Sequence, residues 1–247
     1  MMNEKSEVII LENSDYREVD ARLCVLSKEY GKMTFVARGI RKPKSKNANS
    51  CNLFQQSVFH FDYNEQRTMQ NLKIAELKYN FKNIRNDLLK QSIASIMVEA
   101  MNKIDIEASN EAFTLLHRAL QYLDSTNNAM ALLGLYIARI CEMCGINPFV
   151  DGCVCCHKEN QLSAISLNDG GFVCSSCFNV YYHKKKDRSI LKFFRLFNKA
   201  TIEQFPLIET ITPCTYQDVE DTLAFFMEYS GVHLQSLKFL KHLSGLN

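Results

Sequence analysis

Two pairs of cysteines in the second half of the sequence have the spacing of metal ligands. The first pair is Cys153 and Cys156 and the second is Cys174 and Cys177, with residues 157–173 between them. Two residues between thiols let one tight turn supply two ligands, and two such turns joined by a hairpin fill a tetrahedral shell. The spacing therefore predicts a structural Zn²⁺ site with no open position for water or substrate.

Neighbouring residues leave the ligand set open by one position. Cys155 precedes Cys156 and His157 follows it, although only Cys153 with Cys156 keeps the two-residue spacing. Cysteines also occur often as small buried hydrophobic residues. A buried structural role is therefore the alternative for the four paired cysteines. It is also what we expect of the five remaining cysteines, Cys24, Cys51, Cys141, Cys144 and Cys214.

The residues between the pairs have the pattern of a hairpin. Residues 164–167 favour a strand, 168–171 contain the Asn, Asp and Gly residues of a turn, and 172–173 favour a return strand. Such a hairpin would bring the two cysteine pairs together.

Composition excludes several classes of protein. The 47% hydrophobic and 23% charged fractions are those of an ordinary globular protein, and 247 residues suffice for one large domain or two to three small ones. The first residues lack the apolar stretch of a signal peptide, and no apolar run approaches the roughly 18 residues of a membrane span. We expect no membrane segment and a cytoplasmic location, where thiols stay reduced and available to metal.

Residues 1–80 have the pattern of a small β barrel. A polar break at 12–15 and a turn at 28–31 separate short stretches of β-favouring residues. Turn signals every ten or so residues predict a closed barrel of five strands. The expected strands are residues 7–11, 20–26, 32–37, 54–61 and 72–77.

A basic loop at residues 38–52 interrupts the predicted barrel. Gly39 and Pro43 prevent a helix there, so we expect a mobile flap that lies along phosphates, while Phe59 and Phe61 are candidates to stack on bases. The alternative is a solvated loop whose charges only aid solubility. The cations are Arg38, Arg41, Lys42, Lys44 and Lys46, with Lys32 just upstream.

From about residue 83 the apolar residues recur at helical spacing. The stripe over 88–104 is expected to be core, and a capping box at Thr215 and Asp218 indicates the start of a later helix. The other expected helices are residues 109–123, 128–145, 189–197 and 231–243. The fold class is therefore α+β: a barrel at 1–80 followed by a helical domain at 81–247 that carries the zinc ribbon at about 150–180.

A second basic cluster follows the last cysteine pair. Its cations are Lys184, Lys185, Lys186, Arg188, Lys192, Arg195 and Lys199. Either a solvated helix face or a nucleic-acid contact would account for it. Three of these, Lys192, Arg195 and Lys199, recur near helical spacing beside Phe193, Phe194 and Phe197, so that charge would lie next to apolar surface.

Sequence motifs of enzymes are missing. The chain has no phosphate-binding loop, no dinucleotide fingerprint, no zinc-protease motif and no nucleophile elbow, and no H-x-E precedes the cysteine pairs as it does in zinc deaminases. We therefore expect a binding protein without catalytic residues.

Taken together, the barrel, helices and ribbon resemble the RecO family of bacterial recombination mediators over nearly the whole chain. Two positions depart from the family's pattern: Arg17 and His157 stand where glycine is usual, and Arg17 would either add a phosphate contact or be an exposed loop residue without a role. The residues that carry the resemblance are 9–11, 15–20, 31–32, 36–39 running into 41–45, 53–54, 81–85, 144–148, 170–174 and, more weakly, 234–238.

The resemblance implies an N-terminal OB-fold, a helical C-terminal domain and a structural zinc ribbon. It implies binding of single- and double-stranded DNA, annealing of complementary strands, and action with RecR to load RecA onto strands coated by single-strand-binding protein. It also implies a site for that protein's acidic, apolar C-terminal tail, which we place at Lys192, Arg195 and Lys199. A bacterial cytoplasm, in association with the nucleoid, is the expected location.

Two other classes of function remain open. One is a zinc-ribbon module that contacts transcription components or RNA, although the residues between the cysteine pairs contain one lysine, Lys158, against Glu159 and Asp169. The other is a metal-dependent nuclease or deaminase. Incubation with labelled complementary oligonucleotides would separate annealing, cleavage and neither.

Overall fold

The computed structural model describes residues 2–105, 109–211 and 213–245, and the chain divides into two compact units, Met1–Asp124 and Ser125–Asn247. The first contains a barrel and helices, and the second contains helices and a small sheet. Each is described by itself. In the described part of the chain, no helix is long and apolar enough to span a membrane.

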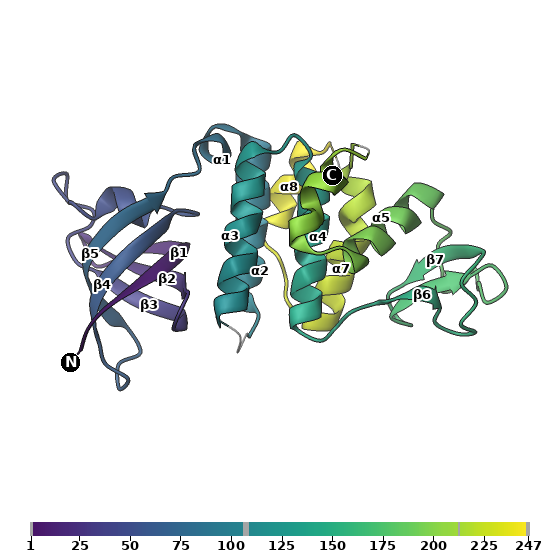
Figure 1. Ribbon diagram of the computed structural model, residues 1–247, viewed down its shortest axis with the longest axis horizontal. Helices are drawn as coiled ribbons and strands as arrows, with labels where there is room; N and C mark the ends of the chain where they lie inside the picture. Colours follow the sequence, from purple (N-terminus) through teal and green to yellow (C-terminus); the bar gives the residue numbers. More distant parts are fainter. Residues whose placement is uncertain (1, 106–108, 212, 246–247) are drawn as a thin grey trace. The chain divides into compact units, whose positions relative to one another are not determined.

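The first unit begins with a closed five-stranded barrel in the order β1-β2-β3-β5-β4 (Figure 1). Neighbouring strands are antiparallel except β3 and β5, and β1 closes the barrel by pairing with both β2 and β4. This order is that of the OB-fold, so the predicted α+β class and barrel are confirmed. The strands are β1 (Met2–Tyr16), β2 (Asp20–Ser27), β3 (Gly31–Ala37), β4 (Gln56–Tyr63) and β5 (Gln70–Tyr79).

The predicted polar break at residues 12–15 is wrong. Strand β1 continues through these residues, which pair with β2 after a bulge between Ile10 and Glu12. A strand that pairs first with one neighbour and then with another needs this length, and partly exposed polar side chains do not prevent backbone pairing.

Three phenylalanines fill the barrel. Phe35 lies edge-on to Phe59 at 5.2 Å and to Phe61 at 5.0 Å between ring centroids, and all three are fully buried. The expectation that Phe59 and Phe61 stack on bases is therefore wrong, because both rings belong to the core.

Three helices complete the first unit: α1 (Lys82–Asn86), α2 (Leu88–Lys103) and α3 (Ser109–Ser125). Helix α2 begins where the Asp87 carboxylate accepts hydrogen bonds from the backbone N–H groups of Leu89 and Lys90 at 2.8 and 3.1 Å. Its predicted apolar stripe is buried from Ile93 to Ile104, but Leu88 and Leu89 at the start of the helix are exposed, so the prediction is wrong for those two residues.

Helix α4 (Ala129–Met143) is the centre of the second unit. Twelve of its residues are buried, as expected for a helix covered on nearly all sides, and α5 (Arg188–Lys199), α6 (Phe205–Glu209) and α7 (Tyr216–Ser230) pack against it. The Thr215 backbone N–H donates to the Asp218 carboxylate at 2.9 Å, which confirms the capping box at the start of α7.

The expected helix over residues 231–243 is shorter than predicted. Gly231 has φ +68°, the left-handed conformation that ends α7, and α8 (Leu237–Leu243) begins only at Leu237. Two short 3₁₀ turns are also present, η1 (Ala48–Cys51) in the first unit and η2 (Ile202–Gln204) in the second.

The small sheet has the order β6-β8-β7, with β6 (Phe149–Cys153), β7 (Leu162–Ser166) and β8 (Gly171–Cys174). Strands β7 and β8 form the predicted hairpin, and β6 is an added parallel neighbour of β8. Gly171 permits this approach, because a Cβ there would lie 2.2 Å from the Phe149 carbonyl oxygen. Phe172 attaches the sheet to α5 through Phe194, edge to face at 5.6 Å.

Helix α4 meets α5 at a glycine, and this contact yields a stability prediction. A Cβ on Gly134 would lie 2.4 Å from Cε2 of Phe197. We expect Gly134→Ala to lower the free energy of unfolding by about 1–3 kcal/mol, because α4 and α5 cannot separate to accommodate the new methyl group without opening the core. Denaturant unfolding measures this.

The matched control is Gly134→Ala combined with Phe197→Leu, which removes the ring that the new methyl group meets. The double variant should lose less stability than the sum of the two single changes. Simple additivity would contradict the steric explanation.

Candidate metal centre and nucleic-acid interface

The four predicted ligands come together at one end of the small sheet. Cys153 ends β6 and Cys174 ends β8, and the turns that follow carry Cys156 and Cys177. Their sulfur atoms all lie within 4.8 Å of one another, and Cys156 and Cys174 are 3.6 Å apart. Tetrahedral ligands at about 2.3 Å from a zinc ion would place sulfurs about 3.8 Å apart, so the donor set fits such an ion.

Backbone groups prepare Cys153 to act as a thiolate. Burial raises its pKa, but N–H groups of Cys174, Cys155 and Cys156 directed at its sulfur outweigh this and bring the pKa to about 6. At Cys174 burial also raises the pKa, but hydrogen-bonding groups outweigh it and the pKa is lowered. The backbone N–H of Cys177 has the largest lowering effect. Because the thiolate is the metal-binding form, the backbone at Cys153 and Cys174 favours a bound cation, whereas the neighbouring Cys156 thiol raises the pKa of Cys177.

The two neighbouring candidates lie outside this cluster. Cys155 is exposed and is not among the four clustered thiols. His157 is also exposed, and its ring lies edge-on to Phe149 at 5.9 Å. The structure therefore brings together the four cysteines that their spacing predicted as ligands.

The basic loop of the first unit presents its cations to solvent. Arg41 forms an ion pair with Asp15 at 3.0 Å and donates to Asn13 at 2.7 Å. The other four, Arg38, Lys42, Lys44 and Lys46, are exposed, and within the described ranges none of them has an ion-pair partner. We call residues 38–46 the flap.

The structure anchors the flap, in contrast to the expected mobile loop. Gly39 donates its backbone N–H to Asp20 at 2.7 Å, and Ile40 is buried in the barrel core. Beyond the flap, the Asn47 side chain accepts from the Ala75 N–H at 3.0 Å and donates to the Lys73 carbonyl at 3.1 Å. The exposed cations therefore lie on a short segment whose two ends are hydrogen-bonded to the barrel.

Two predicted contacts lie outside the flap. The Lys32 ammonium donates to the carbonyls of Asn102, at 3.0 Å, and Ile104, so its charge compensates the C-terminal end of α2. Arg17 is exposed, and its guanidinium lies 5.2 Å from the centre of the Tyr16 ring.

The predicted partner residues line a groove in the second unit. Helix α5 forms one side of a cavity of about 900 Å³, which also includes Leu162 and Phe172 from the small sheet. Lys192 is exposed, Arg195 donates to the Val150 carbonyl at 2.8 Å, and Lys199 pairs with Asp151 at 2.7 Å.

The apolar part of this prediction is wrong. Phe193, Phe194 and Phe197 are buried, so they contribute core rather than a docking surface. The accessible apolar lining comes instead from the half-buried Leu162, Leu191 and Leu196. Arg195 lies 5.3 Å from the Phe172 ring centre, and its buried Nη2 has no hydrogen-bond partner in the described part of the chain.

Comparison with known proteins connects these features. Residues 1–81 match the family described as Recombination protein O N terminal, and residues 85–230 match Recombination protein O C terminal. The chain belongs to the RecO family. Two relatives named DNA repair protein RecO are those of Halalkalibacterium halodurans, 28% identical with 99% of this chain and 97% of the relative covered, and Bacillus cytotoxicus, 27% identical with 98% of each covered.

Both departures from the RecO glycine pattern occur in left-handed backbone. Arg17 has φ +59° and His157 has φ +61°. This conformation costs a residue with a Cβ about 1–2 kcal/mol, which is why glycine suits both turns.

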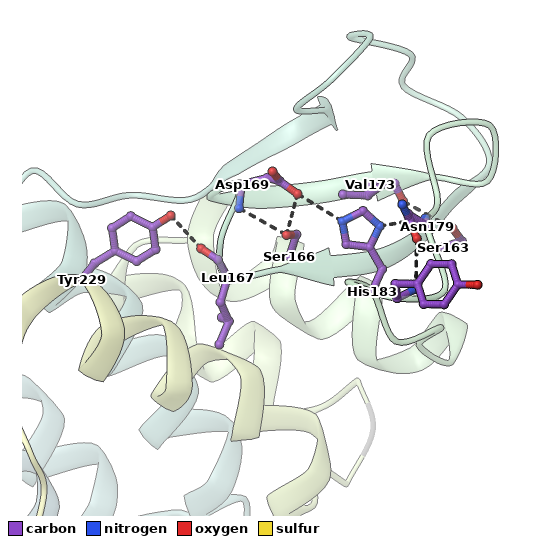
Figure 2. A network of polar contacts seen from close by, with 9 residues as sticks. Ser163, Ser166, Leu167, Asp169, Val173, Asn179, His183 and Tyr229 are labelled. Atoms are coloured by element: carbon purple, nitrogen blue, oxygen red, sulfur yellow. Dashed lines mark hydrogen bonds and ion pairs between the residues drawn. The ribbon is translucent and has the colours of Figure 1, made fainter.

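A polar network that the sequence did not reveal holds the turn of the β7–β8 hairpin (Figure 2). Asp169 accepts from Ser166 at 2.7 Å and lies 3.1 Å from Nε2 of His183, and these two contacts lower its pKa. Tyr229 of α7 donates to the Leu167 carbonyl at 2.7 Å. The RecO ribbon is thus tied to α7 as well as α5.

The ligand set predicts how metal content responds to substitution. We expect one metal ion per chain in purified protein, and its loss in Cys174→Ser, because a serine hydroxyl is a poor replacement for a buried thiolate. Unfolding temperature should fall in parallel, since metal binding contributes folding free energy to this small sheet. Elemental analysis and thermal unfolding measure both.

Cys155→Ser is the matched control, because it removes a neighbouring exposed thiol outside the cluster. It should keep the metal content of the wild type. A full metal equivalent in Cys174→Ser, or its loss in Cys155→Ser, would contradict the assigned ligands.

Proposed function

We propose that this RecO-family protein is a recombination mediator that binds single- and double-stranded DNA and anneals complementary strands without catalysing a reaction. The observation that carries this proposal is the flap on an OB barrel, in which Arg38, Lys42, Lys44 and Lys46 are exposed and have no ion-pair partner among the described residues. Residues 1–80 act as the DNA-binding domain, and residues 81–247 act as the domain for partners. Its place of action is the bacterial cytoplasm, at the nucleoid.

The chemistry of the flap favours phosphates over bases. Lysine is a compact point charge without the planar fork that recognises a base edge, and three of the four unpaired cations are lysines. Anchored ends keep the charges close to the barrel, so less conformational entropy is lost when a strand binds. Arg41 lies within the flap but must exchange its ion pair with Asp15 to reach a phosphate, and Arg17 would add a contact from outside the flap.

The metal centre supports a binding role. Four thiolates are the ligand set of structural Zn²⁺, and they leave no position for an activated water. Cys153, Cys156, Cys174 and Cys177 would hold this ion, and its contribution is to fix the ribbon. A nuclease or deaminase would need an open coordination position.

The groove on α5 is the proposed site for the C-terminal tail of single-strand-binding protein. Lys192, Arg195 and Lys199 provide positive charge beside the apolar Leu191 and Leu196, which complements an acidic peptide with an apolar end. Arg195 lines this groove and is held in place by the hydrogen bond from its Nε to the Val150 carbonyl. Cooperation with RecR and delivery of RecA rest on family membership.

Annealing of complementary oligonucleotides tests the function, and a flap variant tests its site. We expect the wild type to accelerate annealing without cleavage. Lys42→Ala/Lys44→Ala/Lys46→Ala should weaken binding to all sequences alike and slow annealing. If all three side chains contact phosphate, the slope of log affinity against log salt should fall by about two units on single strands. Fluorescence anisotropy over a salt series measures this.

The charge-conserving variant Lys42→Arg/Lys44→Arg/Lys46→Arg is the control and should keep the wild-type salt slope. Wild-type affinity and slope in the alanine variant would place the DNA contact elsewhere. Cleavage, or neither activity, in the wild type would favour a nuclease or a zinc-ribbon module instead.

The groove makes a separate prediction. Lys192→Glu should weaken binding of a synthetic acidic tail peptide about five- to tenfold, because it places a negative charge where the peptide carries its own. Lys238→Glu, an exposed lysine on α8 outside the groove, should leave the affinity unchanged. Isothermal titration measures both, and equal affinities for the wild type and Lys192→Glu would place the peptide site elsewhere.

A further inference from the structure

Three apolar or aromatic side chains are unusually exposed just after the metal centre. Val180, Tyr181 and Tyr182 are 75%, 88% and 74% exposed, and they lie between Cys177 and helix α5. Scattered exposed hydrophobic residues are ordinary, but two adjacent tyrosines that contribute nothing to the core indicate a contact surface. We call residues 180–188 the tyrosine loop.

The backbone at the start of the tyrosine loop is fixed by its own hydrogen bonds. Asn179 accepts from the Tyr181 N–H through its side chain at 2.9 Å, and its carbonyl accepts from the N–H groups of Tyr182 and His183 at 3.1 and 2.8 Å. The tyrosines therefore lie on a closed turn rather than on a free segment. Ordering such side chains on binding costs less than ordering a flexible loop.

His183 ties this turn to the hairpin (Figure 2). Its Nδ1 accepts from the Asn179 N–H at 3.0 Å, and its Nε2 lies 3.1 Å from the Asp169 carboxylate. Asp169 in turn bonds to Ser166. Because both ring nitrogens are used, the imidazole acts as a bracket between the turn and the sheet, and the rings of the tyrosines are left outside it.

Cations follow the tyrosines directly. Lys184, Lys185 and Arg188 are exposed, and over the described ranges the structure gives none of their side chains an ion-pair partner. Lys186 is different, because it pairs with Asp221 of α7 at 2.7 Å and fixes the far side of the loop. Asp187 is the acidic residue of the tyrosine loop, so the three cations without an ion-pair partner among the described residues give the loop an excess of positive charge.

We propose that the tyrosine loop is a second binding site for single-stranded nucleic acid, separate from the flap. Tyr181 and Tyr182 stack on bases, and Lys184, Lys185 and Arg188 contact the adjoining phosphates. Stacking on exposed rings beside unpaired cations is how proteins hold single strands without recognising sequence. The site would select single strands, since paired bases do not present their faces.

Charge and shape favour this ligand over others. A membrane-bound segment needs a broad aliphatic face, and Val180 is the one aliphatic residue at the exposed turn. The proposal rests on the proposed function in taking DNA as the nucleic acid. It adds to that function, because a chain that anneals strands needs to hold two of them, and the flap and the tyrosine loop would each hold one.

Tryptophan fluorescence provides a direct test in the full-length protein. The chain contains no tryptophan, so Tyr181→Trp creates a single reporter at the site. Oligo(dT) should quench this fluorescence, whereas an abasic strand of equal length, which keeps the phosphates and lacks the bases, should quench it far less. Equal quenching by both strands would show that the ring does not stack.

Affinity for oligo(dT) provides the second measurement, made in the wild type and in the flap alanine variant. Tyr181→Ala/Tyr182→Ala should lower affinity at least about fivefold. Tyr181→Phe/Tyr182→Phe keeps both rings and should retain wild-type affinity. Circular dichroism and metal content should be unchanged in both variants, because the exposed rings do not support the fold.

The outcomes separate the two proposals. Wild-type protein that fails to bind any oligonucleotide overturns the proposed function. Wild-type protein that binds, with unchanged affinity in Tyr181→Ala/Tyr182→Ala and no quenching in Tyr181→Trp, overturns the second site alone. A response of the reporter to anionic phospholipid vesicles or to the acidic tail peptide, but not to oligo(dT), would assign the loop to that ligand instead.

Discussion

The arrangement of the second unit depends on four thiols meeting at one point. Its sheet has three short strands, and the buried cluster beneath them consists of Cys153, Cys174, Ala164 and Val173. So small a core supplies little hydrophobic free energy, so the sheet needs an additional link to stay folded. A metal ion bound by the four thiolates would provide one, and the groove and the tyrosine loop are both built on the segments that it would join.

The barrel depends on a different interaction and contains none of the four clustered thiols. Phe35, Phe59 and Phe61 pack edge to face inside it, and every strand has two neighbours because β1 pairs with both β2 and β4. Closure leaves no strand edge open to aggregation and leaves loops as the surface available for ligands. The flap is such a loop, and its fixed ends turn a mobile basic segment into a defined one.

Much of this architecture was predictable, and the errors have physical causes. Cysteine spacing selects the ligands because it reflects local turn geometry. Phe59 and Phe61 are two residues apart on a strand, so the pattern shows that they share a face but not whether that face is inside. The contacts of Arg195 with Val150 and of His183 with Asp169 join distant residues, and local periodicity carries no information about them. Polar residues 12–15 suggested a turn, yet pairing with β2 determines their conformation.

The left-handed residues show how local cost and function are balanced. Arg17 and His157 each give up about 1 kcal/mol or more relative to glycine at the same φ. At His157 the ring packs edge-on against Phe149 at the start of β6, and this contact returns part of that energy. At Arg17 the side chain is exposed, and among the described residues its recorded contact is with the neighbouring Tyr16 ring, so little energy is recovered within the barrel. The contacts of Arg17 in the described part of the chain therefore do not account for its left-handed conformation.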